Sequence, residues 1–160
     1  MAKVQINLCR ALKLKNRLAS RLSRLDSLIV GHNSTVRDFS EFDVRQLYTR
    51  RMLLAEQLVE LKVQISEANR PIQKQIFEAA ECKSACTMLG RIDTKHGPHA
   101  EGFGQNLQEF AAQFRKTDIN RETRKIENEI DRLQDELDQF NYQTKISVDE
   151  KLLEPDDDFE

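Results

Sequence analysis

The sequence contains no tryptophan and has only five glycines, three prolines and three cysteines among its 160 residues. So few glycines and prolines exclude an all-β sandwich, because many short strands need many turns. The odd number of cysteines argues against a disulfide scaffold. The absence of a continuous apolar stretch near the start argues against a secretory signal. We therefore expect reduced thiols and a cytoplasmic protein. No run of 18 apolar residues is present, so no membrane-spanning helix is predicted.

What the sequence does contain is charge and helical periodicity. Charged residues make up 32% of the chain and apolar residues 39%, which is typical of long helices with a charged surface. Four segments, at about residues 4–30, 41–68, 71–93 and 117–148, carry apolar residues at alternating steps of four and three. This spacing predicts an all-α fold, an antiparallel bundle of four long helices with coiled-coil-like packing. We expect one domain over residues 1–148.

Each segment carries one seam of apolar residues, and Lys15 and Arg51 are the charged interruptions of the first two seams. Burying one Leu or Ile is worth roughly 1.5–3 kcal/mol, whereas an isolated helix of this length is only marginally stable. The seams are therefore predicted to pair, within one chain or between chains. The four seams are Val4, Leu8, Ala11, Lys15, Leu18, Leu22, Leu25 and Ile29; Val44, Leu47, Arg51, Leu54, Leu58, Leu61, Ile65 and Ala68; Ile72, Ile76, Ala79, Cys82, Cys86 and Leu89; and Ile119, Thr123, Ile126, Ile130, Leu133, Leu137, Phe140 and Thr144.

Local signals mark the ends of the first three segments. Gly31 is predicted to end the first helix in a left-handed conformation. Ser40-Glu41-Phe42-Asp43 has the form of a capping box at the start of the second helix. Pro71 breaks or kinks the rod, because proline lacks an N–H yet fits the first turn of a new helix. Whether the second and third segments form one kinked rod is left open.

Three further segments are expected outside the long helices. Residues 94–106 hold three of the five glycines and form the predicted flexible loop. Residues 107–116 fit either a short helix or an extended stretch. Residues 149–160 carry seven acidic residues and one lysine, so they are predicted to form a disordered acidic tail.

Charge is spread unevenly, because residues 1–37 carry eight basic residues against one acidic residue. The basic start and the acidic end can screen each other, within one molecule or between neighbours. Alternatively, a basic ridge on the first helix binds nucleic acid, although it lacks interleaved aromatic residues. In the first interpretation the ridge forms ion pairs, for which a row of carboxylates in the fourth segment is available. The basic ridge is Arg10, Lys13, Arg17, Arg21 and Arg24, and the carboxylate row is Glu122, Glu129 and Glu136.

The best candidate for a metal site is Cys82-x3-Cys86 followed by His96-x2-His99. Two cysteines four residues apart project from the same side of a helix, and two histidines could complete a tetrahedral zinc site. The spacing differs from that of zinc fingers. Both cysteines also lie on the apolar seam, where an unpaired cysteine behaves as a small hydrophobic residue. We assign no metal ligand and keep zinc binding as an alternative.

No catalytic or cofactor-binding residue is assigned either. Gly97 and Gly102 have the interval of a phosphate-binding loop, but Phe103-Gly104 stands where lysine and serine or threonine are needed, and no strand is predicted before them. The histidines lie in predicted loops, and no serine or cysteine has a recognisable activating context. The sequence therefore predicts a protein without enzymatic activity and without a cofactor.

The last predicted helix contains Asn141-Tyr142-Gln143-Thr144 close to its end. This ending, and the segment Arg132 to Thr144 that contains it, resemble the closing helix of small bacterial proteins often labelled septicolysin. Residues 11–22 and 65–69 are similar in pattern to the same family, while residues 94–117 depart from it. The resemblance implies an all-helical fold and no established activity. The label suggests a cytolysin, but no residue here supports lysis and we do not carry that role over.

The function predicted from the sequence is protein–protein interaction, with self-association into a homo-oligomer as the favoured form. The four apolar seams are the basis of this prediction. A nucleic-acid-associated protein that uses the basic ridge is an alternative from another class, and a zinc-binding helical protein is a second one.

Overall fold

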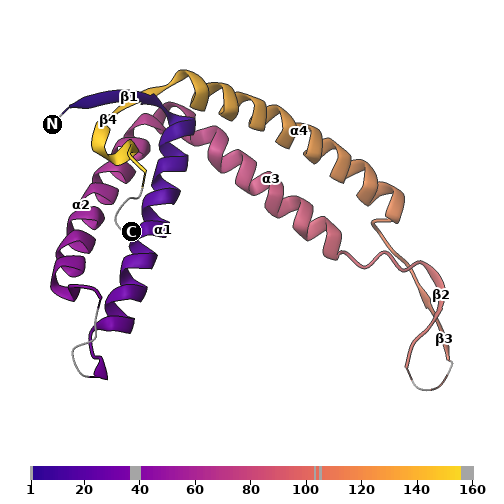
Figure 1. Ribbon diagram of the computed structural model, residues 1–160. Helices are drawn as coiled ribbons and strands as arrows, with labels where there is room; N and C mark the ends of the chain where they lie inside the picture. The colour runs from indigo at the N-terminus through magenta and orange to yellow at the C-terminus, as the bar shows by residue number, and fades with distance from the viewer. Residues whose placement is uncertain (1, 37–40, 103, 105, 156–160) are drawn as a thin grey trace. The chain divides into compact units, whose positions relative to one another are not determined.

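The structure is a computed structural model that describes residues 2–36, 41–102, 104 and 106–155. Within these residues it has four α-helices and two small antiparallel sheets of two strands each (Figure 1). The mainly helical fold predicted from the sequence is confirmed, and the short strands are an addition to it. The elements are β1 (Lys3–Asn7), α1 (Leu8–His32), α2 (Val44–Ala68), η2 (Arg70–Ile72), α3 (Gln73–Arg91), β2 (Gly97–Ala100), β3 (Leu107–Phe110), α4 (Lys116–Gln143), β4 (Lys145–Asp149) and η3 (Glu150–Leu153).

The chain divides into two compact units. The first, the α1–α2 unit, comprises Met1–Pro71 and Asp138–Glu160, and the second, the α3–α4 unit, comprises Ile72–Leu137. The range 1–148, for which the sequence predicts one domain, is thus shared between two units. Each unit is built around its own pair of long helices.

The α1–α2 unit has a continuous apolar core made by the first two predicted seams. Helices α1 and α2 lie side by side (Figure 1). Leu18 is fully buried, and Arg51, the predicted interruption of the second seam, donates from Nε to Asp26 Oδ1 of α1 at 2.9 Å. Leu14, which no predicted seam includes, joins the core. The buried cluster comprises Ile6, Leu8, Ala11, Leu14, Leu18, Leu25, Leu47, Leu54, Leu58, Leu61, Ile65, Ile146 and Val148.

Strands β1 and β4 change two predicted helix boundaries: α1 begins at Leu8 and not near residue 4, and α4 ends at Gln143 and not near residue 148. Residues 4–7 are not the first turn of a helix but belong to β1, which pairs antiparallel with β4 in the register Val4 to Val148 and Ile6 to Ile146. The period-two alternation of both segments sends these four side chains towards the core and polar residues outwards. Asn7 then caps α1, because its side chain accepts the N–H of Arg10 at 2.9 Å.

The predicted acidic tail begins too early for the same reason. Asp149 is the last residue of β4, and residues 150–153 form η3, whose Leu152 and Leu153 pack against the core. The backbone N–H of Glu150 also donates to the carbonyl of Ala2 at 3.0 Å. Apolar burial and strand pairing therefore order this part of the segment, and residues 156–160 lie outside the described residues.

The helix ends differ in detail from the prediction. Helix α1 continues through Gly31 to His32, and Gly31 does not have a positive φ. Asn33 caps it instead, with its N–H donating to the carbonyl of Ile29 at 3.2 Å. Asp43 caps α2 by accepting the N–H of Gln46 at 3.1 Å, while Ser40 lies outside the described residues. A turn of 3-10 helix at Arg70–Ile72 separates α2 from α3, so the break at Pro71 is confirmed.

The α3–α4 unit has a thinner core. Helices α3 and α4 lie side by side in opposite directions (Figure 1), and Glu78 of α3 is close enough to raise the pKa of Arg132 in α4. Both predicted seams face inwards, but most of their members are only half-buried. Among the described residues, the buried ones of this unit are Ile72, Ala79, Leu89, Ile119 and Leu133.

The segment between α3 and α4 is a β-hairpin where a flexible loop was predicted. Strand β2 pairs antiparallel with β3, in the register Gly97 to Phe110 and His99 to Gln108. Gly97 and Gly102 have φ of 85° and 83°, a left-handed conformation that favours glycine. The glycines that suggested a loop therefore shape a hairpin. Of the two alternatives left open for residues 107–116, the extended one is confirmed at Leu107–Phe110.

Candidate interaction surface

Helix α2 has a second apolar face besides the one that packs against α1. Tyr48, Met52, Val59 and Val63 form this face, which we call the outer stripe. At 100° per residue the four fall within an arc of about 60°, and the middle of that arc lies about 140° from the buried seam. The outer stripe therefore points away from the core of its own unit.

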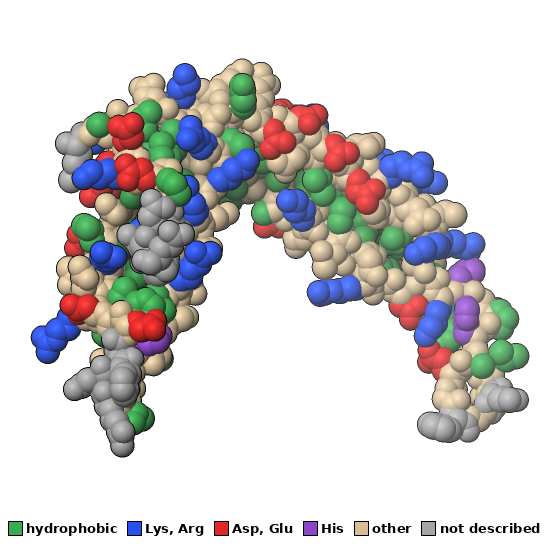
Figure 2. All heavy atoms as spheres, in the orientation of Figure 1, with side chains coloured by type: hydrophobic (Ala, Val, Ile, Leu, Met, Phe, Trp, Pro, Cys, Tyr) green, Lys and Arg blue, Asp and Glu red, His purple; other side chains and the backbone are tan. Residues whose placement is uncertain are grey.

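The outer stripe is open to solvent. The exposed fractions are 56% for Tyr48, 42% for Met52, 59% for Val59 and 50% for Val63. Apolar residues scattered singly on a surface need no explanation, whereas these four are aligned along one helix face. Figure 2 shows apolar side chains reaching the surface among charged ones over the α1–α2 unit.

Charged residues of opposite sign stand at the two ends of the outer stripe. Arg45 lies one turn before Tyr48, and Glu67 lies one turn after Val63. Both side chains are exposed, and neither forms an ion pair with another residue in the described part of the chain. The outer face of α2 is thus basic where the helix begins and acidic where it ends.

The outer stripe is not among the predicted seams, because each helix was assigned a single seam. The signal is nevertheless present: the four residues are separated by steps of four, seven and four. A second search for helical spacing, after the first seam had been removed, would have found it. Leu53, another exposed apolar residue of α2, points about 110° away from the outer stripe and is not part of it.

The basic ridge of α1 lies partly beneath the C-terminal segment. Arg17 donates from Nη2 to the backbone carbonyl of Leu152 in η3. Arg10, Lys13 and Arg17 border a depression of about 120 Å³ together with Leu153. The structure therefore places Arg17 of the basic ridge against Leu152 of η3, and screening of the basic start by the acidic end stays a prediction.

The other members of the basic ridge lie further along α1. Arg24 borders a depression of about 470 Å³ with Leu28 and Phe42, and Arg21 borders one of about 240 Å³ with Arg50. Arg24 forms no ion pair with the residues that the structure describes. The ridge is consequently divided among three separate depressions and does not line one continuous groove.

The carboxylate row of α4 has basic partners on its own helix. Arg132 donates from Nε to Glu129 Oε2 at 3.0 Å and from Nη1 to Glu136, and Lys125 Nζ lies 3.1 Å from Glu122 Oε1. These partners lie three or four residues apart on the same helix, where side chains meet directly. The hydrogen bond from Arg132 lowers the pKa of Glu129, and the same bond is the main reason why the pKa of Arg132 is raised.

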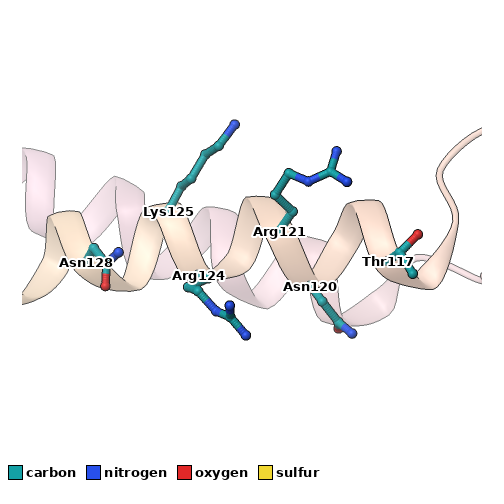
Figure 3. A pocket seen from close by; sticks show the side chains of 6 residues that line it. All are labelled: Thr117, Asn120, Arg121, Arg124, Lys125 and Asn128. Atoms are coloured by element: carbon teal, nitrogen blue, oxygen red, sulfur yellow. The ribbon is translucent and has the colours of Figure 1, made fainter.

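Near its start, α4 presents a polar depression of about 370 Å³ (Figure 3). Arg121 and Lys125 point to one side of the helix, and Arg124 and Asn120 point to the other (Figure 3). Arg121 Nη1 lies 3.7 Å from Asp118 Oδ1, and Lys125 is held by Glu122. Because carboxylates of the same helix accompany two of its three cations, the depression offers little excess positive charge to an anionic ligand.

The structure does not assemble the candidate zinc site from the residues that it describes. Cys82 and Cys86 are half-buried on the inner side of α3, where the apolar seam predicts them. His96 Nδ1 instead accepts the backbone N–H of Ala112 at 3.2 Å, and the ring of His99 packs edge-on against Phe110 with 6.0 Å between centroids. Nowhere among the described residues do three or more potential ligands come together.

Comparisons with known proteins do not add a family: no family model matches the chain, and neither a curated protein nor a solved structure matches it. The resemblance to proteins labelled septicolysin therefore stays a prediction. Within the part of the chain that the structure describes, no helix is both long enough and apolar enough to cross a membrane.

Proposed function

We propose that the protein is a non-enzymatic, cytoplasmic helical protein that acts through protein–protein contact, and that its partner is a second copy of the chain. The observation that carries this proposal is the outer stripe of α2, four exposed apolar side chains on one helix face. Covering such a face removes apolar surface from water, and this stabilises the complex by about 25 cal/mol for each Å² buried.

A second copy is the favoured partner because the outer face of α2 is complementary to itself. Its basic end at Arg45 and its acidic end at Glu67 attract each other when two copies meet. Two α1–α2 pairs joined across the outer stripe would place four long helices in one layer, with the two copies of α2 in the middle.

The proposal is tested by sedimentation velocity over a range of micromolar concentrations. We expect the wild-type chain to form a dimer and Val59→Glu to weaken the dimer about a hundredfold or more, because a carboxylate would be buried without a partner. Val30→Glu is the matched control: Val30 is 82% exposed on α1 and far from the outer stripe in sequence. A wild-type chain that stays monomeric throughout would refute the proposal.

Binding of nucleic acid by the basic ridge remains a second candidate, favoured by Arg10, Lys13 and Arg24. None of these three forms an ion pair within the described residues. The engagement of Arg17 by Leu152 weighs against it. This candidate requires binding that weakens with salt and that is lost when Arg10 and Arg24 are changed to glutamate. Absence of binding at low salt would end it.

Zinc binding remains a third candidate, without a structural observation in its favour. Cys82 and Cys86 could offer two thiolates, but His96 and His99 are engaged within the hairpin. The candidate requires one zinc ion for each chain in protein purified without chelators. Folded protein that contains no metal would eliminate it.

A further inference from the structure

The outer stripe has a symmetry that bears on how two copies would meet. Its steps of four, seven and four residues read the same in both directions, about a centre between Ala55 and Glu56. We infer that two copies of α2 pack antiparallel across a twofold axis at this centre. The inference rests on the proposed self-association and adds the orientation and register of the pair.

Antiparallel pairing about this centre matches every member of the outer stripe with another. Tyr48 faces Val63 of the second copy, and Met52 faces Val59. Each of these layers sets a large side chain against a small one, which is the arrangement that lets facing surfaces interdigitate. A parallel pair would instead set Tyr48 against Tyr48 and Val59 against Val59, so that layers of unequal width alternate along the interface.

The small side chain at the centre suits a close approach of the two helices. Ala55 is half-buried and lies about 50° from the middle of the outer stripe. Two copies of Ala55 meet on one flank of the twofold axis, and two copies of the exposed Glu56, which lies about 50° to the other side of the middle of the stripe, meet on the opposite flank. Such a contact is isologous, so it closes with two chains and does not propagate into a filament.

The charges at the two ends of the outer stripe favour the same orientation. In the antiparallel register Arg45 lies opposite Ser66 and next to Glu67 of the second copy, and the symmetry makes this ion pair twice. Parallel pairing would bring Arg45 next to Arg45 and Glu67 next to Glu67. The macrodipoles of the two helices also oppose each other favourably when the helices run in opposite directions.

Disulfide cross-linking tests the register. The background carries Cys9→Ser, Cys82→Ala and Cys86→Ala, and single variants Tyr48→Cys and Val63→Cys are made in it. After mild oxidation we expect a cross-linked dimer when the two variants are mixed, and little from either variant alone. Peptide mass analysis should show that the disulfide joins position 48 of one chain to position 63 of the other. Cross-linking of Tyr48→Cys to itself would overturn the antiparallel register while leaving self-association intact.

A charge reversal provides a second readout that needs no new cysteine. Arg45→Glu and Glu67→Arg are each expected to weaken the dimer about threefold to tenfold, and the double variant is expected to restore it. Two single losses without recovery in the double variant would overturn the antiparallel register. A wild-type chain that is monomeric by sedimentation refutes the proposed function itself, so the two failures are distinguishable.

Discussion

The two units of this chain use similar helices but stabilise them differently. In the α1–α2 unit, thirteen of the described residues are buried in one cluster, and side-chain caps at Asn7 and Asp43 begin both helices. In the α3–α4 unit five described residues are buried, and α3 begins at Ile72 without a side-chain cap. An amphipathic pattern is therefore enough to form both helix pairs, but the two pairs differ in how many apolar side chains they bury.

The α3–α4 unit, which has the thinner core, carries several ion pairs between residues that are close in sequence. In α4, Glu122, Glu129 and Glu136 all have basic partners three or four residues away. In the hairpin, Lys95 pairs with Asp93 and Glu101 and lies 5.5 Å from the ring centroid of Phe110. Such exposed pairs contribute little each, so we expect the α3–α4 unit to be the less stable of the two.

The largest expected effect comes from the core of the α1–α2 unit. Leu18→Ala removes a fully buried side chain from the centre of the α1–α2 contact and should lower the free energy of unfolding by about 2 to 5 kcal/mol, because it leaves a cavity. Chemical denaturation followed by circular dichroism measures this loss. Val30→Ala, an exposed position on the same helix, should change stability by less than about 0.5 kcal/mol. Equal effects of the two substitutions would contradict the assigned core.

The equivalent substitution in the other unit should cost less. Leu133→Ala also removes a fully buried side chain, but its half-buried neighbours can close around the space, so we expect a loss near the lower end of the same range, about 2 kcal/mol. Hydrogen exchange resolved by peptide should show faster exchange in α3 and in α4 up to residue 137, with α1 little affected. A larger loss than that of Leu18→Ala would reverse the comparison of the two cores.

The side-chain cap of a single helix is expected to have a smaller effect on stability than a buried leucine. Asn7→Ala removes the acceptor of the Arg10 N–H at the start of α1 and should cost about 1 kcal/mol. Asn16→Ala changes the same residue type on an exposed position inside α1, where alanine is the better helix former. Thermal unfolding should therefore separate the two variants in opposite directions. A neutral Asn7→Ala would show that β1, and not the cap, fixes the start of the helix.

Much of the fold could be predicted because long amphipathic helices have a strong period. The four helices, the break at Pro71 and the inward position of Cys82 and Cys86 all follow from that period. Segments shorter than two helical turns could not be assigned in this way, because Val4 and Leu8 fit a helical step of four as well as a strand that leads into a helix. The pairing of β1 with β4 depends on a contact between the two ends of the sequence, which no local pattern shows.

The candidate site was less predictable than the fold. The outer stripe consists only of valine, methionine and tyrosine, so in the sequence it cannot be told apart from a seam that packs in the core. What distinguishes the outer stripe is its exposure after the first seam has been buried, and exposure of Val59 or Val63 is a property of the folded unit. Pairing of the carboxylate row with the basic ridge stays a prediction because the two lie in different units, and within α4 the row has partners at steps of three and four.

The smallest expected effect is a dependence on pH in the α3–α4 unit. The hydrogen bonds from Arg132 lower the pKa of Glu129 below its ordinary value in the folded chain. A group whose pKa is lowered by folding stabilises the folded state above its unfolded pKa and loses that contribution as the pH falls through the folded one. Wild-type protein should therefore unfold at a slightly higher temperature than Glu129→Gln at neutral pH, and the two should converge in acid.

Glu127→Gln is the matched control for this measurement. Glu127 lies two residues away on the same helix, carries the same charge and forms no ion pair within the described residues. Its substitution should leave the difference between neutral and acidic pH unchanged. A difference between wild type and Glu129→Gln that persists in acid would show that the side chain acts through packing and not through its charge. The stability of the α3–α4 unit would then depend on its five described buried residues more than on its ion pairs.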